Sequence, residues 1–158
     1  MTDPPQEPAT AIYIERLLPA SIDEVFAAWT DPALMANWLS PIGHAEIEAD
    51  LRVGGQFCVT MVGDDLRLEH TGVYLVIDPP RRLSFTWLSP YTGGHASRVD
   101  VTLTAHGATT LLVLTHQRLP DETTASHEGG WVAMLDRLDA LLGASVGATP
   151  APMSDDAP

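Results

Sequence analysis

Between His44 and His116, hydrophobic and polar residues alternate in short segments, with the period of two that is typical of half-buried β-strands. Clusters of glycine, proline and aspartate separate the segments, as turns between strands require. The pattern predicts a first strand over residues 11–17 and then six in series over residues 44–50, 56–62, 68–77, 82–88, 97–104 and 109–116. Because the connections are short, we expect consecutive strands of the series to pair antiparallel, as a meander.

Two short helices are predicted between the first strand and this series. Ser21 and Glu24 have the capping-box spacing, in which each side chain accepts a hydrogen bond from a backbone amide at the start of the helix. Asp31 and Pro32 give a second start signal, with aspartate as the N-cap and proline at the first helical position. Apolar residues follow both signals at helical spacing, and Pro41 is expected to end the second helix.

A long amphipathic helix is predicted after the strands. Apolar residues recur at helical spacing over residues 124–142, with Gly143 as the expected C-cap. Gly129 and Gly130 lie near the start of this helix, although each glycine costs about 1 kcal/mol in helix propensity. We interpret the pair as serving either a close backbone approach to the sheet or room for a bound molecule.

This order of elements predicts an α+β domain, in which a curved antiparallel sheet of about six to seven strands wraps around the long C-terminal helix. A strongly bent sheet need not close its core over one helix, so its concave side can leave a cavity. The domain is expected to span residues 11–143. The proline-rich residues 1–10 and the residues 144–158, rich in small and acidic side chains, are expected to be disordered tails.

The composition is that of one folded domain, and it disfavours some classes of binding partner. The chain has 158 residues, 45% of them hydrophobic, which is enough to bury a sizeable core. It carries 21 acidic and 8 basic residues, a net charge of −13, so nucleic acid and anionic membrane surfaces are disfavoured. No apolar run has the length of a membrane span, so no membrane insertion is expected. The one cysteine, Cys58, favours a cytoplasmic location and is expected to be a buried apolar residue rather than a reactive thiol.

Several motifs, taken in order, resemble one protein superfamily. They are residues 19–32 (PASIDEVFAAWTDP), Trp38, residues 50–57 (DLRVGGQF), 72–74 (GVY), 77–80 (IDPP), 82–87 (RLSFTW), 115–116 (TH) and 130–131 (GW). As a set they resemble the SRPBCC (START / birch-pollen-allergen-like) superfamily, and within it the subfamily named after the activator of the heat-shock-protein-90 ATPase. The resemblance covers about residues 11–143. It implies a helix-grip fold with a deep apolar cavity under the C-terminal helix, in a superfamily whose members bind lipids, sterols, polyketides or other apolar molecules.

The residues expected to line such a cavity are mostly aromatic. Indole and phenol rings offer apolar area with one polar atom, which suits an amphipathic ligand, and methionine adapts to irregular shapes. Trp131 is the strongest candidate, because it lies on the inward face of the long helix beside the glycine pair. An ordinary packed core uses the same residue types, and the sequence leaves both interpretations open. The predicted ligand-binding residues are Phe26, Trp29, Trp38, Met61, Tyr74, Phe85, Trp87, His116, Trp131, Met134 and Leu135.

His70 and His116 are the candidates for catalysis, because each lies in a predicted strand among apolar residues. A neutral imidazole there can act as an acid or base or orient a ligand carbonyl, and a structural histidine is the alternative. His127 is expected to flank the cavity mouth. The nearest carboxylates, Glu69, Asp100 and Glu128, have no spacing that assigns them acid or base roles. No HxH, HExxH or GxGxxG motif is present, so no metal and no cofactor are predicted.

Three functions are compatible with these features. The leading hypothesis is a cytoplasmic protein that binds a small apolar or amphipathic molecule in the cavity, without demonstrable catalytic activity. The second is an enzyme of the polyketide cyclase/dehydratase or hydrolase type, which needs a cavity histidine near a carboxylate. The third is a co-chaperone-like interaction module, which needs an exposed apolar patch of roughly several hundred Å². A homodimer is compatible with all three.

Overall fold

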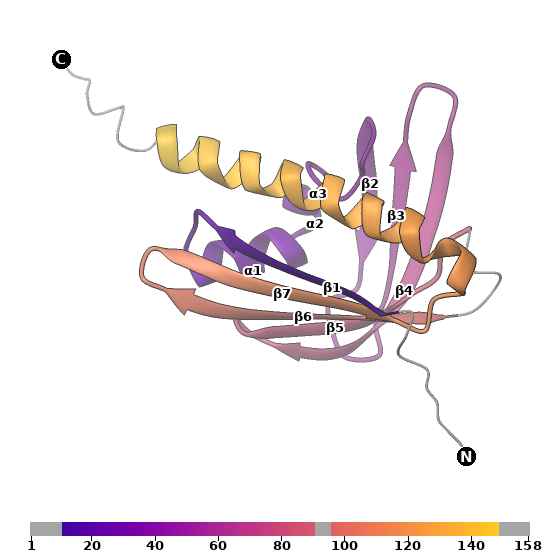
Figure 1. Ribbon diagram of the computed structural model, residues 1–158, viewed down its shortest axis with the longest axis horizontal. Coiled ribbons are helices and arrows are strands. Elements are labelled where there is room, and N and C mark those ends of the chain that lie inside the picture. The colour runs from indigo at the N-terminus through magenta and orange to yellow at the C-terminus, as the bar shows by residue number, and fades with distance from the viewer. Residues whose placement is uncertain (1–10, 91–95, 149–158) are drawn as a thin grey trace.

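A seven-stranded antiparallel sheet forms the body of the protein. The computed structural model describes residues 11–90 and 96–148. The strands are β1 (Ile12–Leu18), β2 (His44–Ala49), β3 (Gln56–Val62), β4 (Arg67–Asp78), β5 (Arg82–Trp87), β6 (Ser97–His106) and β7 (Thr109–Gln117). Their order is β1-β7-β6-β5-β4-β3-β2, so β2 to β7 form a meander and β1 lies beside β7 (Figure 1). The predicted strands and their antiparallel series are confirmed, with each end within two residues.

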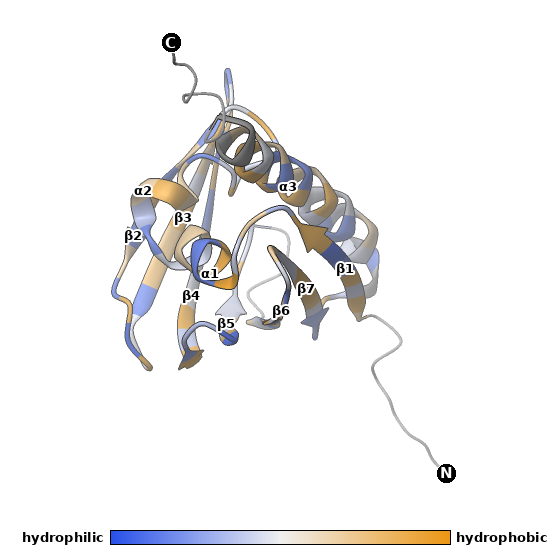
Figure 2. Ribbon diagram, turned by 90° about the vertical axis from the view of Figure 1, so that its left-hand side faces the viewer, coloured by the Kyte–Doolittle hydropathy of each residue, from blue (hydrophilic) through white to orange (hydrophobic). Residues whose placement is uncertain are grey.

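The sheet is strongly curved and its helices lie within the curve. In Figure 2 it forms an arch, with β2 and β3 on one arm and β7 and β1 on the other. The helix α1 (Ile22–Thr30) lies between the arms, and α3 (Asp121–Ala148) lies across the opening. This arrangement confirms the predicted α+β class, the curved sheet and the helix-grip architecture. The expectation of disordered tails over residues 1–10 and 144–158 is wrong for residues 144–148, which continue α3, and for residues 1–10 and 149–158 it lies outside the described residues.

The two predicted helix start signals are both used. Ser21 Oγ accepts from the Glu24 amide at 3.2 Å, and Glu24 Oε1 accepts from the Ser21 amide at 3.1 Å, which completes the capping box of α1. Asp31 caps the second helix, α2 (Pro32–Met35), by accepting from the Ala33 amide at 3.0 Å.

The second helix is shorter than the sequence predicts. It ends at Met35 rather than near Pro41, because the chain tightens into bonds of the i to i+3 type, with the amide of Trp38 donating to the Met35 carbonyl at 3.2 Å. The tightening leaves Leu34 38% exposed and turns Trp38 fully inward. Both tryptophans of this region, Trp29 and Trp38, therefore point into the core.

The long helix extends beyond its predicted bounds at both ends. It begins at Asp121 and continues to Ala148, so Gly143 lies within the helix and is not its C-cap. The prediction followed the apolar periodicity, which is absent from the polar first turn and from the small residues at the end. No helix within residues 11–90 and 96–148 is both long and apolar enough to cross a membrane.

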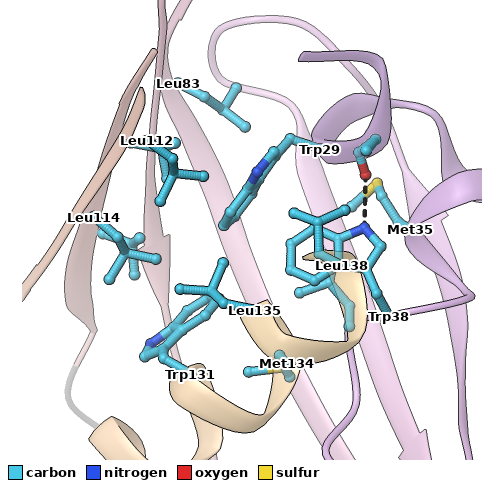
Figure 3. Packing of buried hydrophobic residues seen from close by; sticks show 14 of the residues in the cluster. Trp29, Met35, Trp38, Leu83, Leu112, Leu114, Trp131, Met134, Leu135 and Leu138 are labelled. Carbon is cyan, nitrogen blue, oxygen red and sulfur yellow. Dashed lines mark hydrogen bonds between the residues drawn. The ribbon is translucent and has the colours of Figure 1, made fainter. Parts of the chain in front are cut away.

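One core occupies the concave side of the sheet. Inward residues of the strands are buried and alternate with outward ones, as in β3, where Phe57, Val59 and Met61 face the core. Gly72 in β4 permits this packing, because a Cβ there would lie 2.3 Å from the Phe57 ring and 2.0 Å from the Thr86 carbonyl oxygen. The helices contribute Trp29 and Trp131, whose rings stack with centroids 6.0 Å apart (Figure 3).

Candidate functional site

A cavity of about 110 Å³ lies between α3 and strands β3, β4 and β5. Its lining is mainly apolar, with two imidazoles and one hydroxyl. The lining residues are Pro41, Met61, Leu68, His70, Trp87, Ser126, His127, Gly130, Trp131 and Met134. Because the lining comes from the sheet, from α3 and from the loop after α2, the cavity exists only in the assembled fold.

The glycine pair of α3 adjoins this cavity and makes no close approach to the sheet. A Cβ built on Gly129 or Gly130 meets no heavy atom within 4 Å. Gly129 is exposed, whereas Gly130 lines the cavity. The close-approach interpretation of the pair is therefore wrong, and the space beside Gly130 is consistent with the other interpretation.

Two histidines border the cavity and are held by neighbouring groups. The Nδ1 of His70 lies 3.1 Å from the Leu68 carbonyl oxygen, and its ring centroid lies 4.9 Å from that of Trp87. Burial lowers the pKa of His70 to about 4, against the opposing effect of its hydrogen bonds to backbone carbonyls. The Nδ1 of His127 lies 2.9 Å from the Thr123 carbonyl oxygen, and its Nε2 lies 3.1 Å from Ser89 Oγ. His127 thus lies at the cavity, as the sequence predicts.

His116 does not reach the cavity; it joins α3 to the sheet through a chain of hydrogen bonds. The indole Nε1–H of Trp131 donates to His116 Nδ1 at 2.9 Å. Since an indole N–H can only donate, Nδ1 accepts, and the imidazole proton is on Nε2, 2.7 Å from Ser97 Oγ. Ser97 Oγ in turn donates to the Trp87 carbonyl at 2.6 Å. Every polar atom of this buried relay has a partner.

The relay fixes His116 in its neutral form. Burial, with a smaller contribution from nearby His127, lowers the pKa of His116 to about 3. A proton added at Nδ1 would face the N–H of Trp131, donor against donor. His116 is consequently a structural residue and not an available acid or base at neutral pH.

The centre of the core is closely packed around a much smaller void. This void has a volume of about 10 Å³ and is lined by Trp29, Met35, Leu39, Phe57, Val59, Tyr74, Leu83, Phe85 and Trp87. Trp29 and Tyr74 are each 2% exposed, and within the described parts of the chain neither Trp29 Nε1 nor the Tyr74 hydroxyl has a hydrogen-bond partner. Burial raises the pKa of Tyr74 to about 12, so the hydroxyl keeps its proton.

The predicted ligand-binding residues fall into three groups. Met61, Trp87, Trp131 and Met134 line the cavity, together with His70. Trp29, Tyr74, Phe85 and again Trp87 line the central void. Phe26, Trp38, Leu135 and His116 are buried in the core and line neither space. The interior is therefore far less hollow than the deep cavity that the sequence and the family resemblance predict.

Pro41 and Ser126 line the cavity without any sequence signal that singles them out. Pro41 belongs to a loop that Arg137 of α3 holds in place. The guanidinium donates through Nη1 to the Ser40 carbonyl and through Nη2 to the Gly43 carbonyl, the latter at 2.8 Å. This contact joins residues more than ninety positions apart, so local patterns carry no trace of it.

Replacing Arg137 with Met is expected to lower the free energy of unfolding by about 2 kcal/mol. Hydrogen bonds to charged groups contribute about 1.5–3 kcal/mol each, and solvent screens this half-buried side chain in part. Urea unfolding of the Met variant, with Arg137→Lys as the variant that keeps the charge, measures the effect. A loss below about 0.5 kcal/mol for the Met variant would mean that the hydrogen bonds of Arg137 do not hold this loop in place.

The carboxylates singled out in the sequence do not face the cavity. Asp100 lies on the outer face of the sheet, where Arg98 and Arg82 contact it at 3.0 and 3.1 Å. Burial alone would raise the pKa of Asp100, but hydrogen bonds from Arg98, Ser84 and Arg82 outweigh it and hold that pKa below its ordinary value. No aspartate or glutamate is among the described residues that line the cavity.

Cys58 also lies on the outer face and is half-buried, which corrects the expectation of a buried core residue. Its Sγ is 3.6 Å from Glu69 Oε2, and burial is the largest of the effects that raise its pKa, so the thiol stays protonated at neutral pH. It borders a wide surface depression of about 680 Å³, whose lining comes mainly from β2, β3 and β4 and from the end of β5. None of the predicted ligand-binding residues lines that depression.

Comparison with known proteins places this fold in a family. The model of the activator of Hsp90 ATPase homolog 1-like family matches residues 19–143. CV1439 from Chromobacterium violaceum has a TM-score of 0.75 and 25% identity, over 84% of this chain and 96% of that one. CalU16 from Micromonospora echinospora has a TM-score of 0.67 and 30% identity, over 87% and 79%.

A third solved structure, DynU16, is described as a protein in the dynemicin biosynthetic locus. It has a TM-score of 0.70 and 25% identity over 86% of this chain and 48% of that one, so this chain spans about half of DynU16. No curated protein matches the chain. Since the family model covers most of the sequence and the fold is that of its structural neighbours, the chain belongs to the activator of Hsp90 ATPase homolog 1-like family, one of the SRPBCC-type families.

Proposed function

We propose that this protein binds a small, largely apolar molecule in the cavity between α3 and strands β3 to β5. The observation that carries the proposal is the cavity itself, whose lining combines aromatic and methionine side chains with two histidines and one serine. Family membership supports it, as does the similarity to DynU16, whose description places that protein in a biosynthetic locus. We take the cytoplasm as its location, in line with the single cysteine.

The size of the cavity restricts the ligand. Its 110 Å³ is below the roughly 300–1,000 Å³ of a site for a drug-sized molecule, and closer to an engineered cavity of about 150 Å³ that binds benzene. Met61 and Met134 form part of the walls, and methionine side chains reshape easily. The proposed ligand is accordingly about one ring in size, or larger where the methionines move.

Binding is supported better than catalysis. His70 is the titratable group that faces the cavity and was predicted as a catalytic candidate, but its lowered pKa makes it a weak base. The other candidate, His116, uses both of its ring nitrogens in the relay. With no carboxylate among the described lining residues, the pair of groups that the enzyme hypothesis requires is not assembled around the cavity.

Replacing Gly130 with Leu is expected to abolish ligand binding, because the new side chain enters the cavity, and Gly129→Leu is the matched control on the exposed side of the same turn. Both substitutions gain a similar helix propensity of about 1 kcal/mol. Tryptophan fluorescence and thermal melting with p-cresol, flavonoids and fatty acids measure binding, since Trp87 and Trp131 line the cavity. If no compound changes either signal, or if the two variants bind equally well, the proposal is wrong.

A further inference from the structure

A serine and a histidine beside the cavity form a hydrogen-bonded pair that the proposed binding function does not use. Ser89 lies two residues beyond the end of β5, is 6% exposed, and its Oγ is 3.1 Å from Nε2 of His127 in α3. The other ring nitrogen of His127, Nδ1, lies 2.9 Å from the Thr123 carbonyl oxygen. A serine, an imidazole and an oxygen that orients the imidazole are the three parts of an activated serine nucleophile.

The hydrogen bonds of the neutral His127 ring show which of its nitrogens carries the proton. A carbonyl oxygen can only accept, so Nδ1 carries the proton and donates to Thr123. Nε2 then presents its lone pair to Ser89, and the serine hydroxyl donates to the ring, as activation by a general base requires. The pair of Ser97 and His116 has the opposite polarity, because there the ring donates and the hydroxyl donates to a backbone carbonyl.

Both members of the pair are held in place at the cavity. Leu88 exchanges two backbone hydrogen bonds with Thr71 of β4, at 2.8 and 2.9 Å, which fixes the segment that carries Ser89. His127 lines the cavity, and its ring meets that of His116 edge to face with centroids 5.5 Å apart. A molecule in the cavity therefore adjoins the imidazole that accepts from Ser89.

We propose that Ser89 and His127 cleave small esters by acyl transfer, with Ser89 as the nucleophile and His127 as the general base. The placement of the substrate rests on the proposed function, because the departing alcohol or phenol is assigned to the cavity. Its oxygen must receive a proton from His127 Nε2, and His127 is the member of the pair that lines the cavity. Ser89 is nearly buried, which restricts the acyl group to a short one such as acetyl.

The proposed reaction is a hydrolysis in two steps. Ser89 Oγ attacks the carbonyl carbon while its proton passes to His127 Nε2, the bond from that carbon to the alcohol oxygen breaks, and the alcohol leaves with the proton. Water then gives a proton to His127 Nε2 and attacks the acyl-serine, the bond to Ser89 Oγ breaks, and the serine recovers the proton. Ester and water thus become a carboxylic acid and an alcohol. The Thr123 carbonyl positions the ring and stabilises the imidazolium that forms in each step.

The test is acetylation by p-nitrophenyl acetate, measured by release of p-nitrophenolate and by peptide mapping with mass spectrometry. The chain contains no lysine, and all proteins compared carry Cys58→Ala to remove the one thiol. We expect an acetyl group on Ser89, none at that position in Ser89→Ala, and acylation about a hundredfold slower in His127→Gln, which keeps a donor and an acceptor but no basic nitrogen. Ser84→Ala, which removes a buried serine hydroxyl that contacts Asp100 on the outer face of the sheet, should react like the parent.

A purely structural role of the pair gives a different result. The acetyl group is then absent from Ser89, or His127→Gln acquires it as fast as the parent protein, and either outcome overturns the inference. Circular dichroism shows which variants are folded, and if Ser89→Ala is not, the rate of His127→Gln decides. Binding of p-cresol is measured separately by tryptophan fluorescence, so binding without acetylation of Ser89 refutes the acyl transfer and leaves the proposed function intact.

Discussion

Replacing His116 with Phe is expected to lower the free energy of unfolding by about 3 kcal/mol or more. The substitution keeps a ring of similar size in the core but removes both ring nitrogens of the relay. The Trp131 N–H then loses its acceptor and Ser97 loses a donor, in surroundings where all three residues are at most 1% exposed. Each buried group left unsatisfied costs about 1–3 kcal/mol.

His116→Gln is the matched variant, because its amide oxygen can accept from Trp131 while its amide nitrogen donates to Ser97. We expect it to lose about 1 kcal/mol, the ordinary cost of an imperfect core replacement. Guanidinium unfolding of both variants gives the comparison. Equal losses for Phe and Gln would show that ring shape, and not the hydrogen-bond relay, is what the position requires.

Stability is expected to fall steeply as the pH drops from about 6.5 towards 4. Burial lowers the pKa values of His70 and His116 to about 4 and about 3, whereas an unfolded histidine titrates near 6.5. Between these values the unfolded chain binds protons that the native protein does not, so acid drives unfolding. Each histidine contributes a slope of about 1.4 kcal/mol per pH unit, and their contribution is fully present above pH 6.5.

Urea unfolding at intervals between pH 7 and pH 4.5 measures this dependence. His116→Gln should remove about half of the slope. Asp100, whose pKa is held below its ordinary value of 3.8, loses its contribution only at lower pH and does not confuse the comparison. A flat profile, or one that rises as acid is added, would mean that neither imidazole is buried in its neutral form.

The sequence predicts best those structural features that depend on residues close together in the chain. Strand alternation and the capping box of Ser21 and Glu24 depend on positions a few residues apart, and the structure has both. The ends of α3 were missed because its polar first turn and its last residues lack the apolar period on which the prediction rested. Gly143 has none of the left-handed geometry expected of a C-cap glycine.

The sequence indicates which side chains turn inward, but not how much space they enclose. Aromatic residues on inward faces indicate that something is buried among them, yet whether they enclose space depends on how their rings interlock. Here Trp29 and Trp38 meet edge to face with centroids 4.6 Å apart and fill the centre, while Gly130 leaves room at one end. The partner of His116 could not be predicted either, because β7 and α3 bring Trp131 to it only in three dimensions.

The position of β1 has a consequence for how the chain folds during its synthesis on the ribosome. Its partner is β7, and Ile12 pairs with His116, roughly a hundred residues downstream. Hairpins β2 to β7 can close as soon as each is made, but the first strand must wait until nearly the entire domain has emerged. Until then Ile12 and Ile14 have no sheet to cover them, so nascent chains that stop short of β7 should be the species that chaperones retain.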